Sequence, residues 1–342
     1  MRKIIREMTV VVAIVMFAPN PVLAQFVKIT PLGSHDGEFC QNDRAMLFED
    51  PTGVRILYDA GQTVAGATDP RLGDVHVILL SHAHNDHIGG TKAAGLNAGT
   101  CNKPQTVSAA PNSNTAEIAA AKNSWIMTSR PMTRFLTKKI QNIRGAVTSE
   151  CPAVGTLRAT TVPTSSPCLA GRPPGGTWIF KVSNATNGVE ITTVRADHDN
   201  TVAPSLITDA GKAILENDGL TAYVGDAVGF VVAFTNGLKV YLSGDTALMS
   251  EMNTIIRSFY KTKLSVINVS SVEKAAFAVN ELLQPNAVIL SHANEAATTG
   301  GKVNPGTRTL QFIDLVKGRP VHLPLSGKTM QFDGNAKCTA GC

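Results

Sequence analysis

The sequence lacks the motifs that define several large enzyme classes. Its 342 residues contain no Gly-x-Ser-x-Gly turn of the serine hydrolases, no glycine-rich phosphate loop and no dinucleotide-binding fingerprint. There is also no tract of lysine and arginine, and the formal net charge of +5 is a mild imbalance. We therefore expect no nucleic-acid partner. Short-period repeats and low-complexity tracts are absent as well.

The sequence also lacks an apolar run long enough to span a membrane. The N-terminus has a basic start, an apolar core of about ten residues over 10–18, and Val22 and Ala24 at the −3 and −1 positions of a cleavage site. A spanning helix needs about 20 apolar residues. The pattern predicts a secretory signal peptide over 1–24, a periplasmic or secreted protein, and no membrane span after cleavage. The charge of the mature chain falls to about +3.

No Cys-x-x-Cys pair occurs, so the cysteines do not have the spacing of a zinc finger. Their number is even, and an even number behind a signal peptide favours disulfides in an oxidising compartment. Six cysteines allow 15 connectivities, so the sequence leaves the pairing open, and free thiols remain the alternative. The six are Cys40, Cys101, Cys151, Cys168, Cys338 and Cys342.

What the chain does contain is a dense cluster of metal-ligand residues. Residues 82–87 read His-Ala-His-Asn-Asp-His, directly after the apolar run 75–81. That run predicts a buried strand, which places the hexapeptide on the loop at its C-terminal end, where functional groups concentrate. On such a loop, two histidines can point one way while Asp86 and His87 point another. One hexapeptide can then serve two metal ions, and the alternative of a solvated polar turn is disfavoured by the density of ligands.

Later strand ends supply more residues of the same kind. His198 follows the alternating strand 189–194, and His292 follows the apolar strand 288–291. Asp245 follows the second strand of a predicted hairpin that turns at Thr-Asn-Gly. Imidazole and carboxylate ligands suit zinc first, and they also suit iron or manganese. We expect these groups to meet at one edge of the fold.

This ligand pattern resembles that of the metallo-β-lactamase superfamily of binuclear metallohydrolases. The resemblance covers nearly all of residues 26–333. The second half is most similar to the lactonase and phosphodiesterase-like branch typified by ascorbate-6-phosphate lactonase, and the first half is similar to the RNase Z and alkylsulfatase-like arms. The resemblance implies an α/β fold, the four-layer αββα sandwich, as one domain over 25–342.

The resemblance also implies a role for each candidate residue. It implies two divalent metal ions, most suitably Zn²⁺, with Fe or Mn as alternatives. The implied ligands are His82, His84 and His198 for the first ion, and Asp86, His87 and His292 for the second. Asp245 would bridge both ions, and Asp59, at an earlier strand end, would orient a ligand histidine or brace the loop. Asp86 and Asp245 are thus the candidate catalytic residues.

The chemistry expected of this ligand set is hydrolysis of a small-molecule substrate. A hydroxide that bridges two metal ions is a nucleophile at neutral pH, and it would cleave an ester, lactone, thioester or phosphoester bond. A β-lactam or an alkyl sulfate is the alternative substrate within the same fold. A catalytically inactive metal-binding protein is the alternative outside enzymes. Complete filling of the seven ligand positions argues against it.

The remaining histidines are expected to have other roles. His76 and His322 lie within predicted strands, which favours packing over ligation. His35 lies in an early loop and is a weaker candidate for the mouth of the site.

Along the rest of the chain, residues 92–188 are expected to form an irregular insertion. Helices are predicted near 115–120 and 133–143, and the Pro- and Gly-rich stretch 145–188 is typical of a lid or a substrate wall. Trp125, Phe135 and Trp178 fit either the mouth of the site or the core. Residues 204–219 predict a loop and short helix over the site. Helices over 246–260, 272–283 and 305–317 are expected to alternate with strands over 264–269, 286–290 and 320–324.

Overall fold

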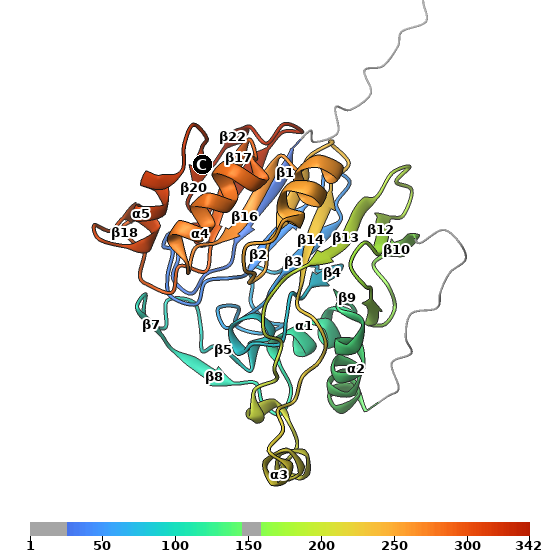
Figure 1. Ribbon diagram of the computed structural model, residues 1–342. Helices are drawn as coiled ribbons and strands as arrows, with labels where there is room; N and C mark the ends of the chain where they lie inside the picture. The colour runs from blue at the N-terminus through green and yellow to red at the C-terminus, as the bar shows by residue number, and fades with distance from the viewer. Residues whose placement is uncertain (1–25, 146–158) are drawn as a thin grey trace, which may run out of the picture.

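A computed structural model describes residues 26–145 and 159–342. Two eight-stranded sheets pack face to face, and helices cover the outer face of each (Figure 1). This is the predicted four-layer αββα arrangement of an α/β protein. The predicted signal peptide and Cys151 lie outside the described residues. No helix in the described part is both long enough and apolar enough to cross a membrane.

The first sheet combines an antiparallel and a parallel part. Its strands, in spatial order, are β11 (Cys168–Gly171), β9 (Trp125–Thr128), β4 (Val77–Leu79), β3 (Arg55–Tyr58), β2 (Met46–Glu49), β1 (Val27–Pro31), β21 (Met330–Phe332) and β22 (Cys338–Ala340). Strands β1 to β3 pair as antiparallel neighbours, and β4 then joins β3 in parallel. The predicted strand over 75–81 is therefore real but shorter. Its C-terminal end opens onto the hexapeptide loop.

The second sheet has the same mixed character. Its order is β10 (Ala159–Val162), β12 (Thr177–Val182), β13 (Val189–Arg195), β14 (Val228–Ala233), β15 (Lys239–Leu242), β16 (Leu264–Asn268), β17 (Ala287–Ser291) and β20 (Val321–His322). Strands β14 and β15 form the predicted hairpin, in the register that sets Phe230 opposite Leu242. Strands β15, β16 and β17 are parallel. Their C-terminal ends therefore lie at one edge of the sheet.

The core between the sheets is built from alternating apolar side chains. In β1, for example, Val27, Ile29 and Pro31 are buried while the residues between them are partly exposed. Such alternation is expected where only one face of a strand meets a sheet. Trp125 and Trp178 face each other across this layer, with ring centroids 5.1 Å apart. The sequence allowed these tryptophans to lie at the mouth of the site or in the core, and the structure places them in the core.

Helices pack on the outer faces through two further apolar clusters. The first sheet is covered by α1 (Asn114–Lys122) and α2 (Arg130–Arg144). The second sheet is covered by η3 (Met252–Tyr260), α4 (Val272–Phe277), η4 (Ala278–Leu283) and α5 (Arg308–Leu315). Phe135 packs against the first of these clusters. The helices predicted after the hairpin are confirmed, although several turns are π-helical.

The expectation of an irregular insertion over 92–188 was wrong for its described part. This stretch contains α1, β9, α2 and the strands β10 to β12, which extend both sheets at one edge. It also holds the small pairs of β5 (Thr91–Ala93) with β8 (Thr106–Ser108), and of β6 (Gly99–Thr100) with β7 (Lys103–Pro104). Strand β9 has four buried residues in a row and no alternation. A strand that is covered on both faces shows no alternation of apolar and polar residues. Four apolar residues in a row are also too few to show any period in the sequence.

The segment 201–223, here called the flap, projects from the body of the protein (Figure 1). It consists of two legs, a short turn η2 (Pro204–Leu206) and the helix α3 (Asp209–Asp218), as the sequence predicts. The legs are held together where the Val202 N–H donates to the Ala222 carbonyl at 2.8 Å. Asn200 at its base accepts a hydrogen bond from the Ala83 N–H at 2.7 Å. The flap is thereby attached to the hexapeptide loop.

The described cysteines are all in disulfides. Cys40 pairs with Cys101, which ties the loop before β2 to the β6–β7 hairpin, and Cys338 pairs with Cys342 near the C-terminus. Cys168 is disulfide-bonded as well. The remaining short strands, β18 (Thr298–Thr299) and β19 (Lys302–Val303), form a hairpin of their own. None of these bridges involves a candidate metal ligand.

Candidate metal centre

The hexapeptide loop is positioned by close backbone contacts at the end of β4. Residues 85–89 form a single π-helical turn, η1 (Asn85–Gly89). The Gly61 N–H donates to the His87 carbonyl at 3.0 Å, and Gly61 has a φ of +54°. A Cβ at this glycine would lie 2.5 Å from the Asp86 carbonyl oxygen. The loop can thus lie this close only because residue 61 has no side chain.

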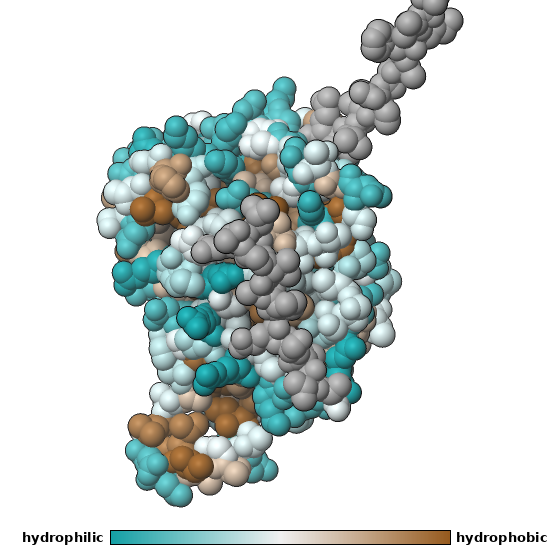
Figure 2. All heavy atoms as spheres, turned by 90° about the vertical axis from the view of Figure 1, so that its right-hand side faces the viewer, coloured by the Kyte–Doolittle hydropathy of each residue, from teal (hydrophilic) through white to brown (hydrophobic). Residues whose placement is uncertain are grey.

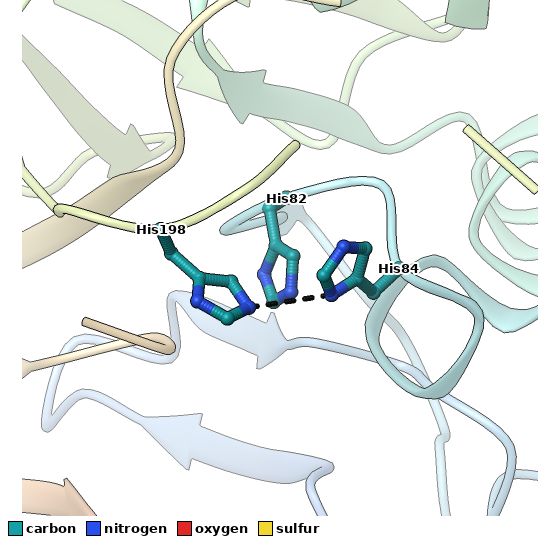
Figure 3. Close-up of side chains that lie close together, drawn as sticks. All are labelled: His82, His84 and His198. Atoms are coloured by element: carbon teal, nitrogen blue, oxygen red, sulfur yellow. Dashed lines mark hydrogen bonds between the residues drawn. The ribbon is translucent and has the colours of Figure 1, made fainter. Parts of the chain in front are cut away.

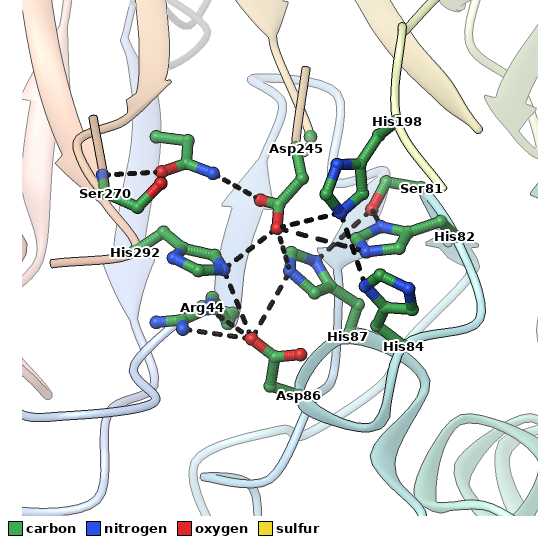
Figure 4. Close-up of polar contacts among 12 residues, drawn as sticks. Arg44, Ser81, His82, His84, Asp86, His87, His198, Asp245, Ser270 and His292 are labelled. Carbon is green, nitrogen blue, oxygen red and sulfur yellow. Dashed lines mark hydrogen bonds and ion pairs between the residues drawn. The ribbon is translucent and has the colours of Figure 1, made fainter. Parts of the chain in front are cut away.

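All seven predicted ligand side chains come together in one cluster (Figure 4). They come from the loop after β4 in the first sheet and from the ends of β13, β15 and β17 in the second. Their potential ligand atoms form three groups, within each of which the atoms lie no more than 4.8 Å apart. These groups are His82, His84 and His198; His82, His87 and Asp245; and Asp86, His87 and His292. Metal binding by these residues stays a prediction.

The first group is a cluster of three histidines (Figure 3). The Nε2 atom of His198 lies 3.3 Å from Nδ1 of His84. On the other side of its ring, His84 has Nε2 at 3.2 Å from the Asp199 carboxylate, which also accepts a hydrogen bond from Thr201. A carboxylate at Nε2 favours the tautomer that carries its proton there. Asp199 therefore leaves the Nδ1 lone pair of His84 directed at the cluster.

Asp59 contacts His87 in the same way as Asp199 contacts His84. Its Oδ2 accepts hydrogen bonds from His87 Nδ1 and from the Ser81 hydroxyl, each at 2.8 Å, and its Oδ1 accepts one from the Ser81 N–H. Asp59 is fully buried and has a positive φ of 39°. Its contacts fix a proton of His87 on Nδ1, and they turn the Nε2 atom toward the cluster. The structure thus places Asp59 where it can orient a candidate ligand.

Asp245 lies between the two sides of the cluster. Its Oδ2 is 3.0 Å from His292 Nε2, 3.4 Å from His87 Nε2, 3.7 Å from His198 Nε2 and 4.0 Å from His82 Nε2. Its other oxygen accepts a hydrogen bond from Asn268 Nδ2 at 2.6 Å. One carboxylate oxygen therefore faces four imidazoles while the second is held by the protein. This is the position that a ligand shared by two ions needs.

The charges of the cluster are tightly coupled. Burial by itself would raise the pKa of the Asp86 and Asp245 carboxyls, but the neighbouring His87 and His292 rings hold both pKa values well below their ordinary range. Burial would also lower the pKa of His87. The carboxylates of Asp245, Asp86 and Asp59 outweigh burial and raise it well above its ordinary value. The pKa of His82 is lowered, first by burial and then by His87. The cluster is thus built to hold positive charge at its centre.

Two unpaired nitrogens test whether a metal fits here. The Nε2 atoms of His82 and His87 are buried, and neither has a hydrogen-bond partner among the described residues. Buried polar atoms without a partner are rare in proteins and call for an explanation. Both atoms belong to the groups described above, and a set of imidazole and carboxylate donors suits Zn²⁺, Fe or Mn. The residues present therefore fit a metal centre.

Several residues that the sequence did not single out support the cluster. Arg44 is only 1 % exposed, and its guanidinium donates to Asp86 Oδ2 at 3.0 and 3.2 Å and to Asn294 at 2.6 Å. Asn268 could have been found, since it is a polar residue at the end of a buried parallel strand like the ligands themselves. Arg44 precedes its strand and shows no such signal.

The other three histidines make no contact with the cluster that the described structure records. His76 Nδ1 accepts a hydrogen bond from the Arg55 N–H, and the His322 ring packs 5.3 Å from that of Phe332. These two have the packing roles expected from the sequence. His35 pairs with the neighbouring Ser34 hydroxyl at 3.0 Å.

Comparison with known proteins points to one superfamily. A family model described as the metallo-beta-lactamase superfamily matches residues 44–94, the segment that contains the hexapeptide. A UPF0173 metal-dependent hydrolase of Koribacter versatilis is 25 % identical over 160 residues, which are 45 % of this chain and 67 % of that protein. One from Cupriavidus metallidurans is 26 % identical over 253 residues, 71 % of this chain and 67 % of its own length.

Among solved structures, the fold is similar to that of the metallo hydrolase Igni18 from Ignicoccus hospitalis. The TM-score is 0.52 at 18 % identity, and the match covers 90 % of this chain and 99 % of the other. The fold is that of a metallo hydrolase, and the site contains side chains that can hold a metal ion. The chain is thus similar to proteins of the metallo-β-lactamase superfamily in the hexapeptide segment and in its fold. The findings support a metal-dependent hydrolase of that fold.

Proposed function

We propose that the protein is a binuclear hydrolase that cleaves an ester, lactone, thioester or phosphoester bond in a small molecule. The observation that carries this proposal is the position of Asp245, whose Oδ2 lies within 4.0 Å of four histidine nitrogens. His82, His84 and His198 would hold one ion, and Asp86, His87 and His292 the other, with Asp245 shared. Bound ions of this kind lower the pKa of water to about 7 and polarise the oxygen of the bond under attack.

The chain's own residues contribute fixed geometry. Asp59 and Asp199 keep the protons of His87 and His84 on the ring nitrogens that face away from the cluster. Arg44 holds the Asp86 carboxylate by two N–H groups. Asn268 holds one oxygen of Asp245, so that the other, Oδ2, stays directed at the centre as a hydrogen-bond acceptor for an attacking water. None of these groups has to reorganise when substrate arrives, which is the main source of catalytic power in such sites.

We further propose that the protein works outside the cytoplasm. The predicted signal peptide over 1–24 supports this location. The Cys40–Cys101 disulfide supports it too, because such bonds persist in oxidising compartments. A periplasmic or secreted setting also favours a freely diffusing small molecule over cytosolic RNA as the substrate.

The test combines metal analysis with turnover. Protein loaded with zinc is expected to contain two ions per chain and to lose activity with a chelator. It should hydrolyse a lactone, carboxylic ester, thioester or phosphodiester in a panel that also contains the alternative substrates, alkyl sulfates and β-lactams. Fully active protein with a single ion would contradict the binuclear proposal. Protein with two ions that hydrolyses nothing in the panel would contradict the proposed reaction.

Asp245→Asn provides the matched test of the shared ligand. The amide keeps the shape but loses the charge, so turnover should fall at least about a hundredfold while the fold is retained. Asp74→Asn, the same change at an exposed residue, is the control and should leave turnover unchanged. An Asp245→Asn variant with both ions and near wild-type turnover would remove Asp245 from the mechanism.

A further inference from the structure

A pocket of about 350 Å³ lies between the hexapeptide loop and the flap. His84 and Asn85 form one wall, and the flap forms the other with side chains that include Pro204, Ile207, Leu215 and Leu220. Its volume is in the range of small-molecule sites, about 300–1,000 Å³, and such sites have mostly apolar walls with a few polar groups. The pocket is thus large enough for a substantial part of a substrate.

The flap carries apolar side chains that the protein itself does not cover. No residue of α3 is buried, and Leu220 and Ile214 are 59 % and 60 % exposed. Figure 2 shows hydrophobic surface gathered on the projecting tip at the bottom of the molecule. A small element with several exposed leucine and isoleucine side chains leaves apolar surface in contact with water, at a cost of about 25 cal/mol per Å². A ligand that covers this surface recovers that free energy.

The pocket adjoins the candidate metal centre at His84, which belongs to both. The same ring that lines the pocket has Nδ1 at 3.3 Å from His198 Nε2 in the three-histidine group. A molecule whose reacting bond lies at the cluster can therefore extend one substituent past His84 into the pocket.

The charges around the pocket favour an uncharged substituent. The charged side chains on its wall are Lys212 and Glu216, which are opposite in sign. Lys212 is already paired with Asp209 at 2.9 Å. Because the wall offers no excess of either charge, an anionic or cationic group would lose its hydration there without a matching partner.

We propose that this pocket binds an uncharged, apolar acyl or alkyl group of the substrate, so that the hydrolysed molecules are esters or lactones with an aliphatic substituent. The inference rests on the proposed function, and it narrows the substrate class of the same site. Leu220 and Leu215 on the flap then determine chain-length specificity, while Ile214, which does not line the pocket, has no such role.

The experiment uses the full mature chain loaded with zinc and two homologous series of probes. The first series is p-nitrophenyl acetate, butyrate, hexanoate and octanoate, followed by kcat/KM. The second is the matching free carboxylates, followed by calorimetric binding, which needs no turnover. In the wild type, kcat/KM and affinity should each rise about fourfold for every added methylene. Leu220→Ser should abolish most of this dependence. Ile214→Ser, an equally exposed change on the same flap, should keep it.

The outcomes separate the two proposals. Chain-length-dependent carboxylate binding that Leu220→Ser abolishes, without ester hydrolysis, supports the pocket and overturns the hydrolysis of esters. Ester hydrolysis with no dependence on chain length overturns the pocket assignment and leaves hydrolysis intact. If both serine variants instead convert a wild-type dimer to a monomer in sedimentation and leave chain-length dependence unchanged, the flap is a subunit contact and the inference is wrong. Equal metal content and melting temperature in the three proteins exclude misfolding as the cause.

Discussion

Replacing Asp59 with asparagine should move the ring proton of the candidate metal ligand His87 from Nδ1 to Nε2. In the structure, Asp59 Oδ1 accepts from the Ser81 N–H, and Oδ2 accepts from His87 Nδ1 at 2.8 Å. An asparagine would keep its single oxygen on the Ser81 N–H, which leaves its NH₂ group facing His87. The ring must then accept at Nδ1, so that its proton moves to Nε2. The lone pair proposed to bind the second ion is lost in that tautomer.

The size of the effect follows from these contacts. Loss of a partner that orients a metal ligand typically costs roughly 10–100-fold in metal affinity. The second ion should be affected and the first should not, because His82, His84 and His198 make no contact with Asp59 that the described structure records. Loss of a charged, buried hydrogen bond should also lower the free energy of unfolding by about 1.5–3 kcal/mol.

The assay is a competition titration of zinc against a chromophoric chelator, together with urea unfolding. The control is Asp69→Asn, the same change at another buried loop carboxylate that pairs with Arg71 and touches no candidate ligand. The control should lose stability but keep both ions. If Asp59→Asn binds two ions with wild-type affinity, Asp59 does not set the tautomer of His87 and the reasoning fails.

Three further predictions follow from other parts of the structure. Gly61→Ala should destabilise the protein by about 1–3 kcal/mol and weaken metal binding, because its φ is positive and its Cβ would press on the Asp86 carbonyl. Gly53 also has a positive φ but open space around it. Gly53→Ala should therefore lower the stability measured by calorimetry through backbone strain alone and leave metal binding unchanged. Burial raises the pKa of the Asp43 carboxyl from 3.8 to about 7, against the opposing hydrogen bonds from Cys40 and Ser34. The native state therefore binds more protons than the unfolded state between these values, so this contribution to stability should be full below about pH 4 and disappear as the pH rises through about 7. Asp43→Asn should remove that slope in urea titrations at several pH values, and an unchanged slope would contradict the assignment. Finally, the exported protein should begin at Gln25, contain no free thiols, and melt lower after reduction while it keeps its metals, since each loop-closing disulfide contributes about 2–4 kcal/mol; mass spectrometry and a thiol titration check this, and six reactive thiols would refute it.

The sequence predicted the ligand cluster because each ligand follows a strand with its own local signal. The hexapeptide comes after a continuous apolar run, Asp245 after a hairpin, and His292 after a buried strand. Since the ends of parallel neighbours meet at one edge of a sheet, placing the strands also places the ligands. The meeting of the hexapeptide, in the first sheet, with the candidate ligands of the second sheet was implied by the family resemblance and not by strand placement.

Other features depended on contacts between distant segments and gave no local signal. Strand β9 is four residues long, and it is stabilised by parallel pairing with β4 and β11. Arg44 resembles any basic residue of a loop until the fold buries it against Asp86. The tryptophans at 125 and 178 fitted two interpretations, because aromatic residues line both cores and binding sites. In each case the deciding partner lies about 40 or more residues away, beyond the range of pattern reasoning.

The candidate ligands come from both sheets, and this has a consequence for folding. The hexapeptide belongs to the first sheet, whereas His198, Asp245 and His292 belong to the second. A metal ion held by these residues would therefore bind only when the two halves of the sandwich are both folded and correctly apposed. Its binding free energy is added to the global unfolding of the whole domain rather than to the local opening of either half. In hydrogen exchange, metal should merge the protection of the two sheets into one cooperative unit.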